Sequence, residues 1–513
     1  LIHIENIPIF VKNVLYSSHH TEFLSLVESE DLRLLCSIDN LSDTSISELP
    51  IIGLKNLKTL TLQNVPTLKR LPPVLSFTHL ETAHFTYAHH CCLFKHVDNV
   101  IEGENGLYKN NAKEIHHRIC RQRETHRSRR QVRGTQWCYV CVAAFDPSEI
   151  GVTRCLDVEE VATVQGFYHN ITCTPQPDAF NPCENIVGLW MLRKAIWPVC
   201  TLAIVGNVLV WVILALAFEK RMRVHYLFMI NLAIADMITG VYLAVLAVQD
   251  VRTGDEYYRH AVSWQTGWGC SMAGFFAVLS SELSIISMFF IAFEMTYNTR
   301  NAFYGQRLSF PVACAMMAGG WAFALIMATL PLLDLSSYST SSICLPLRLH
   351  NIGDRAYIIF FLLFNLLAFV AMVFCYVLLM SMLKDPRTPS RAEDNLIIKK
   401  MVWLVGVDFL CWFPTLFFGL SAATGYPLIS LSSAKILLVF FFPINASANP
   451  FLYVFFTKVN FFASNIVIDV FIRIYKSNFS TLSNFYHLQP PNRREEVSQF
   501  HSVFYTFSAV LAK

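Results

Sequence analysis

The residues of this chain with the clearest chemical potential are its cysteines, because nine of the fifteen precede residue 195. Such a density in a polar stretch indicates an oxidising compartment and disulfide bonds. Cys138 and Cys141 have the spacing of a zinc-ligand pair, but no second Cys/His pair follows at zinc-finger spacing, so a disulfide is favoured there. The nine cysteines are Cys36, Cys91, Cys92, Cys120, Cys138, Cys141, Cys155, Cys173 and Cys183.

A second group of candidates consists of ionisable residues inside long apolar runs. They are Asp236, Glu282, Asp408 and Lys435. A charge inside a bilayer costs several kcal/mol, so each is a candidate for function or for pairing with a neighbouring helix.

Polar amides accompany these charges, at Asn207, Asn231, Asn365, Asn445 and Asn449. Hydrogen bonds between membrane helices that only fix packing contribute about 0.6–2 kcal/mol each, and we predict that role for Asn231 and Trp321. For Asp236, Asn445 and Asn449 we predict a polar network that rearranges when the protein switches state. Pro414 and Pro450 remove backbone hydrogen bonds in mid-helix, where motion can concentrate.

The elements that must position these residues are seven apolar segments, each close to bilayer length. About 20 apolar residues cross the hydrocarbon core as a helix, and only 15% of this chain is charged against about 25% in soluble proteins. The segments run at about 195–217, 226–248, 271–293, 312–333, 356–382, 401–423 and 434–456. The sequence therefore predicts an all-α bundle of seven transmembrane helices.

The charges of the loops predict the orientation of the bundle. If residues 1–190 lie outside, the inner loops 219–223, 294–311 and 383–400 hold ten Lys/Arg residues and the outer loops hold four. This distribution obeys the positive-inside rule, and it places the carboxyl terminus in the cytoplasm of a plasma-membrane protein.

The region before the membrane shows a short repeat. Two Leu-Pro pairs, at Leu49 and Leu71, are 22 residues apart, and Leu57 and Leu80 are 23 apart. This period is typical of leucine-rich repeats, which form an α/β solenoid, although chance spacing is an alternative. Because two or three repeats rarely stand alone and the chain begins at Leu1, we expect that further repeats and a signal peptide precede it.

The linker beyond the repeats carries two further signals. The basic run Arg127–Arg130 is either a processing site or simply a solvated stretch. Asn40 and Asn170 open glycosylation sequons on the expected outer side.

Several motifs within the apolar segments resemble those of the rhodopsin-like seven-helix receptors. Cys270 and Cys344 stand where that class has its outer-loop disulfide. The other matching motifs are Gly206–Asn207, Asn231–Asp236, Trp321, Cys411–Pro414 and the span-seven signature Asn449–Tyr453.

Further motifs narrow the resemblance to the leucine-rich-repeat glycoprotein hormone receptors. Within the membrane region these are His260–Cys270, Ser281–Ser284, Asn365 in a span without proline, and Phe442–Pro450. Outside it, Tyr87–Cys92 resembles the start of that family's hinge and Phe180–Ile186 resembles its end. The resemblance is to an amino-terminally truncated, invertebrate-type member. It implies repeats at 1–90, a Cys-rich, disulfide-linked hinge at 91–190, the seven-helix domain at 191–457 and a cytoplasmic tail at 458–513.

The resemblance also implies partners and roles. The repeats would hold a cystine-knot glycoprotein hormone, and the bundle would admit a heterotrimeric G protein, usually the stimulatory type that raises cyclic AMP; no cofactor is implied. Disulfides would join Cys91 to Cys173, Cys92 to Cys183 and Cys270 to Cys344. The tethered activator would comprise Phe180, Asn181, Pro182, Glu184 and Asn185. The activation network would comprise Asn207, Asp236, Asp408, Trp412, Pro414, Asn445, Asn449, Pro450 and Tyr453. The G-protein face would comprise Glu294, Met295, Tyr376, Lys399 and Lys400.

Three positions depart from the family pattern. Met295 replaces an arginine that packs against the G protein, which puts ordinary coupling in doubt. Asn185 stands where the family has an acidic residue, which would weaken the tethered activator. Trp412 departs toward the common receptor pattern, in which an aromatic residue at this kink acts as a rotamer switch.

Three alternatives to a signalling receptor follow from these patterns. Because of Met295, a non-signalling hormone decoy or adhesion protein is the leading one. A transporter or channel is disfavoured because paired broken helices and a pore-lining charge series are lacking. An enzyme is least favoured, because the intramembrane acids occur singly and no nucleophile elbow, P-loop or dinucleotide fingerprint appears.

Overall fold

A computed structural model describes residues 40–49, 54, 57–72, 74, 77–96, 140–143, 153–156, 168–216, 223–333, 335–347, 351–384 and 392–456. Cys36, Cys120, Cys138 and the Arg127–Arg130 run lie outside these residues, as does the tail. The chain forms two compact units. The repeat unit holds Leu1–Pro177 with Tyr258–Val262, and the helical unit holds Asp178–Tyr257 with Ser263–Lys513.

The repeat unit contains a parallel sheet in the order β1–β2–β5. Strand β1 (Thr59–Leu62) pairs with β2 (Thr82–Phe85), and Thr59 opposes Thr82, 23 residues further along the chain. This is the predicted repeat period. Every second residue of both strands points into a core of leucine and phenylalanine side chains, so each repeat buries its apolar face against the next.

The third strand of this sheet comes from far along the chain. Strand β5 (Thr172–Thr174) pairs in parallel with β2, so part of the predicted hinge completes the sheet. Helix α4 (Ala88–Lys95) follows β2, and its Cys91 forms a disulfide with Cys173 of β5. A separate antiparallel pair joins β3 (Val140–Ala143) to β4 (Thr153–Leu156), with Cys141 opposite Cys155 in the backbone register.

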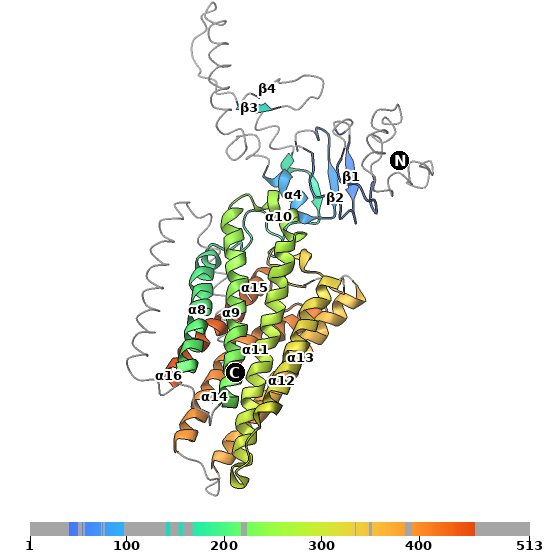
Figure 1. The fold of residues 1–513 in the computed structure, drawn as a ribbon. Helices are drawn as coiled ribbons and strands as arrows, with labels where there is room; N and C mark the ends of the chain where they lie inside the picture. The colour runs from blue at the N-terminus through green and yellow to red at the C-terminus, as the bar shows by residue number, and fades with distance from the viewer. Residues whose placement is uncertain are drawn as a thin grey trace, which may run out of the picture. The chain divides into compact units, whose positions relative to one another are not determined.

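The helical unit consists of long helices that run side by side (Figure 1). Apolar runs of this length become helices in lipid because only helical hydrogen bonding satisfies every backbone group there. The first five long helices are α8 (Trp190–Leu216), α9 (Arg223–Arg252), α11 (Trp268–Arg300), α12 (Phe310–Thr329) and α13 (Ile352–Lys384). The remaining long helices are α14 (Ala392–Ala423) and α16 (Phe442–Phe456), the latter preceded by α15 (Leu431–Ile436) and the π-helical turn η8 (Leu437–Phe441).

Shorter helices lie in the loops between them. Helix α10 (Tyr257–Gln265) follows α9, η5 (Ala302–Tyr304) lies between α11 and α12, and η6 (Leu330–Leu333) with η7 (Tyr338–Thr340) follows α12. Helix α11 is the centre of the bundle, since it packs against α9, α12 and α13.

All seven predicted segments fall on helices. By length and composition, six helices of the described residues can cross a membrane, the last being the α15–η8–α16 segment from Leu431 to Pro450. For the predicted sixth span, the apolar stretch among the described residues is the shorter Phe409–Ala423. The helices continue through Pro414 and Pro450, the two prolines singled out from the sequence.

Candidate functional site

One end of the helical unit is covered by the loop after α12, which packs directly on α11. Cys270 in the first turn of α11 is joined to Cys344 by a disulfide with a Cα–Cα distance of 5.3 Å, as the resemblance implied. At Gly274 a Cβ would collide with the Cys344 carbonyl and the Tyr338 ring, so only glycine allows this approach. Burial raises the pKa of Tyr338, whose hydroxyl donates to the Ala328 carbonyl at 2.8 Å.

The cap segment, residues 178–188, is folded into the same end of the helical unit. The side chains of Ile186 and Val187 are fully buried. The Ile186 carbonyl accepts from the Lys435 ammonium at 2.6 Å and from the Ser342 hydroxyl at 3.0 Å. Lys435, which the sequence marked as a costly buried charge, therefore binds the backbone of the segment that leads into the first span.

Asp250, at the end of α9, holds the cap segment from a second side. Its Oδ1 accepts from the Val187 amide at 3.0 Å, and its Oδ2 accepts from Arg193 Nε at 2.7 Å. Both partners of this ion pair are enclosed, with side-chain exposures of 13% for Arg193 and 3% for Asp250. A charge pair this far from water persists only when hydrogen bonds satisfy its remaining atoms, and the Val187 amide supplies one of them.

Asn185 makes a reciprocal pair with Asp255. Its side-chain amide donates to Asp255 Oδ1 at 3.2 Å and its oxygen accepts from the Asp255 amide at 3.0 Å. An acidic residue at position 185 would place a second carboxylate against that of Asp255, so the asparagine suits its partner. Nearby, Asn181 accepts from Gln265 at 3.0 Å, and the Phe180 carbonyl accepts from the Ser342 amide at 2.8 Å.

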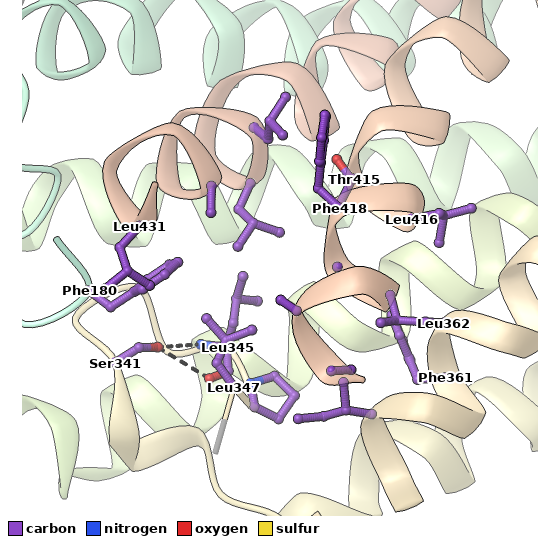
Figure 2. Close-up of a pocket in the computed structure, with 18 of the residues that line it drawn as sticks. Phe180, Ser341, Leu345, Leu347, Phe361, Leu362, Thr415, Leu416, Phe418 and Leu431 are labelled. Carbon is purple, nitrogen blue, oxygen red and sulfur yellow. Dashed lines mark hydrogen bonds between the residues drawn. The ribbon is translucent and has the colours of Figure 1, made fainter. Parts of the chain in front are cut away.

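A cavity of about 420 Å³ lies beneath the cap segment, between the helices (Figure 2). Phe180 of the cap segment lines it beside Leu431. Other lining side chains come from α11, α13 and α14, among them Ser281, Phe361 and Trp412, and most of them are apolar. Trp412 is buried with its ring 5.9 Å from that of Phe369. A movement of the cap segment would therefore act on the walls of a space shared by these helices.

A polar network crosses the middle of the bundle. Asp236 accepts from Asn449 Nδ2 at 2.7 Å and from the Ser284 hydroxyl at 3.4 Å, which links α9 to α16 and α11. Asn207 donates to the Ala446 carbonyl at 3.0 Å and so links α8 to α16. The structure thus brings Asp236 and Asn449 together, whereas Asn445 accepts from the adjacent Ala446 amide.

The comparisons with known proteins agree with this architecture. Residues 206–453 match the family described as 7 transmembrane receptor (rhodopsin family). The chain is 36% identical over 469 residues to the follicle-stimulating hormone receptor of Cairina moschata, and 36% identical over 475 residues to the thyrotropin receptor of Sus scrofa. It is 38% identical over 425 residues to the lutropin-choriogonadotropic hormone receptor of Mus musculus. The chain thus resembles the glycoprotein hormone receptors over most of its length.

These similarities cover most of this chain and a smaller part of each relative. The matches span 87%, 86% and 82% of the chain but 64%, 61% and 58% of the three relatives, so the chain spans less than two thirds of their length. The relatives are receptors rather than enzymes, in line with the expectation from the sequence.

Two further polar pairs join spans of the helical unit. Glu282 of α11 accepts from Asn365 Nδ2 of α13 at 2.8 Å, so this buried acid has an amide partner. Trp321 Nε1 of α12 donates to Asn231 Oδ1 of α9 at 2.8 Å. The second contact is of the kind predicted for Asn231 and Trp321, a hydrogen bond that fixes packing.

The opposite end of the bundle, which we expect to face the cytoplasm, contains Glu294 and Met295. Met295 is buried in the apolar core of the bundle, as are Tyr376 and Phe228. Glu294 Oε2 lies 3.0 Å from His225 Nδ1 of α9. The backbone of α14 and α16 is described at Lys399, Lys400, Asp408 and Tyr453, but their side chains lie outside the described part of the chain.

The remaining predicted positions lie in the repeat unit and in the cap segment. Cys92 and Cys183 are each disulfide-bonded. The two sequon asparagines, Asn40 and Asn170, are exposed, as glycosylation requires. Within the cap segment, Glu184 is exposed and its carbonyl accepts from the Tyr257 amide at 3.1 Å, while Pro182 is half-buried.

Sequence reasoning missed four residues that organise the two ends of the bundle: Arg193, Asp250, Ser342 and His225. Arg193 and Asp250 flank apolar runs, where charged residues commonly mark the membrane boundary. The sequence therefore does not indicate that these two residues form a pair. Ser342 lies in a serine-rich loop two residues before Cys344, and His225 is an isolated histidine at a helix start.

Proposed function

We propose that this protein is a cell-surface receptor for a glycoprotein hormone and that it signals through a heterotrimeric G protein. The observation that carries the proposal is the seating of the cap segment: the Ile186 carbonyl is bound by Lys435, and the Val187 amide is bound by Asp250. The peptide that leads into the first span is thus part of the packed bundle. Displacement of this peptide must repack the outer ends of the helices.

In this proposal the regions have distinct tasks. The repeats at 1–90 bind a cystine-knot hormone outside the cell, and the hinge at 91–190 transmits the event through a tethered activator that includes Phe180, Asn181 and Asn185. The seven-helix domain at 191–457 responds, and the tail at 458–513 lies in the cytoplasm. Support for the hormone class comes from the relatives, whose names state that they are receptors for follicle-stimulating hormone, thyrotropin and lutropin-choriogonadotropic hormone.

Activation is a shift between two arrangements of the bundle. A near-complete switch requires the hormone to bind the active arrangement about 5.5 kcal/mol more tightly than the resting one. The contacts that must change are those around Asp236 and Asn449, together with the walls of the cavity beside Trp412. The outward movement of span six then admits a G protein, of the stimulatory type that raises cyclic AMP.

The experiment that tests this proposal is expression of a chain completed at its amino terminus, with a cyclic-AMP readout against candidate cystine-knot hormones. We expect a rise in cyclic AMP with one of them. Surface display and hormone binding without any response would contradict signalling.

Met295 makes a second experiment informative, because this residue stands where the family has an arginine. Met295→Arg should change the amplitude of the hormone response while leaving hormone binding unchanged. If cyclic AMP responds only in the Met295→Arg variant, the protein is a decoy or adhesion protein rather than a signalling receptor.

A further inference from the structure

The inner end of α11 carries an acid whose usual neighbour is missing. Glu294 is followed by Met295, and Met295 is 7% exposed within an apolar core. A buried carboxylate requires hydrogen-bond donors, because an unpaired charge away from water is strongly unfavourable. Glu294 is 6% exposed, so its donors must come from other parts of the bundle.

Two side chains supply these donors, one to each carboxylate oxygen. His225 Nδ1, in the first turn of α9, lies 3.0 Å from Oε2, and its own side chain is 4% exposed. Asn298 Nδ2, one turn further along α11, donates to Oε1. Both oxygens of Glu294 are therefore occupied without an arginine at position 295.

The second donor connects Glu294 to the loop between α11 and α12. Asn298 Oδ1 accepts from the backbone amide of Leu308 at 3.0 Å. Asn298 lies in the last turn of α11 and Leu308 lies two residues before α12, so a single amide side chain bridges the loop between the two helices. Within the loop lie η5 and the left-handed Gly305, with φ of 62°, and Tyr304 is 79% exposed.

We propose that His225, Glu294 and Asn298 are positioning residues that fix the loop between α11 and α12, residues 301–309, against spans two and three, without an arginine at position 295. Histidine orients the carboxylate, the carboxylate orients the asparagine, and the asparagine holds the Leu308 amide. The loop is then held in one shape at the face where, if the proposed function holds, a G protein docks. The positioning itself does not depend on that function.

Amide hydrogen exchange of the full chain in lipid nanodiscs tests the positioning directly, through the Leu308 amide. Asn298→Ala should speed its exchange by about fivefold to tenfold, because the variant removes the acceptor. His225→Ala should give a smaller increase of about threefold, because it acts through Glu294, and His225→Gln, which keeps a donor, should restore protection. Asn301→Ala is the matched control: Asn301 directly follows α11, its side chain donates to the Tyr297 carbonyl of that helix, and exchange at Leu308 should stay within twofold.

A rescue experiment separates positioning from a general loss of packing. In the wild-type background, Met295→Arg must compete with His225 for Glu294, so it should leave Leu308 exchange within twofold. In the His225→Ala background the carboxylate is free, so adding Met295→Arg should return exchange at Leu308 toward the wild-type rate. Unchanged exchange in His225→Ala, or failure of both His225→Gln and Met295→Arg to restore protection, would overturn the inference.

The same variants distinguish this inference from the proposed function. Nucleotide exchange on a purified stimulatory G protein should fall in Asn298→Ala by a factor of about three or more and stay unchanged in Asn301→Ala. If Leu308 exchange responds as expected but no variant, including the wild type, acts on the G protein, the positioning stands and the proposed function fails. If the wild type acts on the G protein and Leu308 exchange is the same in every variant, the inference fails alone.

Discussion

Lys58 and Glu81 in the repeat unit form an ion pair that lies mostly in water, whereas Arg193 and Asp250 in the helical unit form one that is almost fully enclosed. The exposures are 72% and 66% for the first pair and 13% and 3% for the second. In the repeat unit water solvates the charges, and the buried contacts are leucine and phenylalanine side chains. In the helical unit the surroundings are lipid and protein, so charges must find their partners within the bundle.

The same difference governs the hydrogen bonds that connect neighbouring elements. In the repeat unit they recur between residues 21 positions apart: Asn64 donates to Asp43 at 2.8 Å, and Thr67 donates to the Ile46 carbonyl at 2.6 Å. In the helical unit the hydrogen bonds between helices do not recur at a fixed spacing, as in the contact of Asp236 with Asn449. A repeat can therefore lose one such bond and keep its neighbours, whereas the bundle depends on single contacts.

The largest effect that follows from this contrast should come from Asp250→Ala. It leaves Arg193 with the more distant Asp255, whose Oδ1 lies 3.8 Å from Arg193 Nη1, and it leaves the Val187 amide without an acceptor, which should cost about 3–5 kcal/mol. Thermal unfolding of the detergent-purified chain measures the loss as a lower apparent Tm. Replacing both charged residues, in Arg193→Met with Asp250→Leu, should recover part of it. Equal stability of Asp250→Ala and wild type would contradict the account of the enclosed pair.

The next effect concerns pH and the repeat unit, whose core includes His90. Burial lowers the pKa of His90 to about 4 from the ordinary value of 6.5, and the rings of Phe85 and Tyr87 pack against it. The unfolded chain thus takes up the proton at a higher pH than the folded one. Stability is full above about pH 6.5 and falls as the pH drops toward 4, by on the order of 3 kcal/mol.

Limited proteolysis of the full chain between pH 7 and 4.5 measures this loss in residues 57–96. His90→Phe should reduce the acid sensitivity, and His79→Phe, at an exposed position, should leave it unchanged. An acid response that is identical in His90→Phe and wild type would show that His90 does not cause it.

A smaller effect should distinguish two glycines of the bundle. Gly274→Ala places a methyl group against the Cys344 carbonyl and the Tyr338 ring, which should cost about 1–3 kcal/mol. Gly319→Ala meets nothing within 4 Å and should be neutral or stabilising by up to about 1 kcal/mol. The apparent Tm of the two variants should therefore shift in opposite directions or by clearly different amounts. Equal shifts would argue against close packing of the loop on α11.

The smallest effect should come from Lys58→Met, which breaks the exposed pair with Glu81. Ion pairs in water contribute little, so the cost should not exceed about 0.5 kcal/mol. Protease resistance of the repeat unit is the appropriate measurement. A loss comparable with that of Asp250→Ala would remove the contrast between the two units.

Sequence reasoning located the helices and the repeat strands because both depend on local patterns. An apolar run of bilayer length predicts a helix, and the spacing of Leu57 and Leu80 predicted the period that separates β1 from β2. Strand β5 could not be predicted from the sequence, because it joins the sheet after an insertion that has no repeat period. The disulfides of Cys91 with Cys173 and of Cys270 with Cys344 were implied by family resemblance, not by spacing.

The contacts at the two ends of the bundle were the least accessible to sequence reasoning. The four ionisable residues within the apolar runs were recognised because they interrupt those runs. The partners of Lys435 and Glu294 could not be recognised, since one is a backbone carbonyl, at Ile186, and another is a histidine, His225, at a boundary where polar residues are ordinary. Contacts between residues that are tens or hundreds of positions apart depend on how the helices pack. Such contacts cannot be predicted from a local sequence pattern.

The wide turn η8, at Leu437–Phe441, separates Lys435 from Asn449 along the last span. A π-helical turn accommodates one residue more than an α-helical turn. If this turn tightened to ordinary α-helix, the part of the span beyond it would rotate by about 100°, the angle of one residue in a helix with 3.6 residues per turn. Asn449 would then face away from Asp236, while Lys435 would keep its hydrogen bond to the cap segment. The extra residue in this turn would thus allow one part of the span to rotate about the helix axis relative to the other.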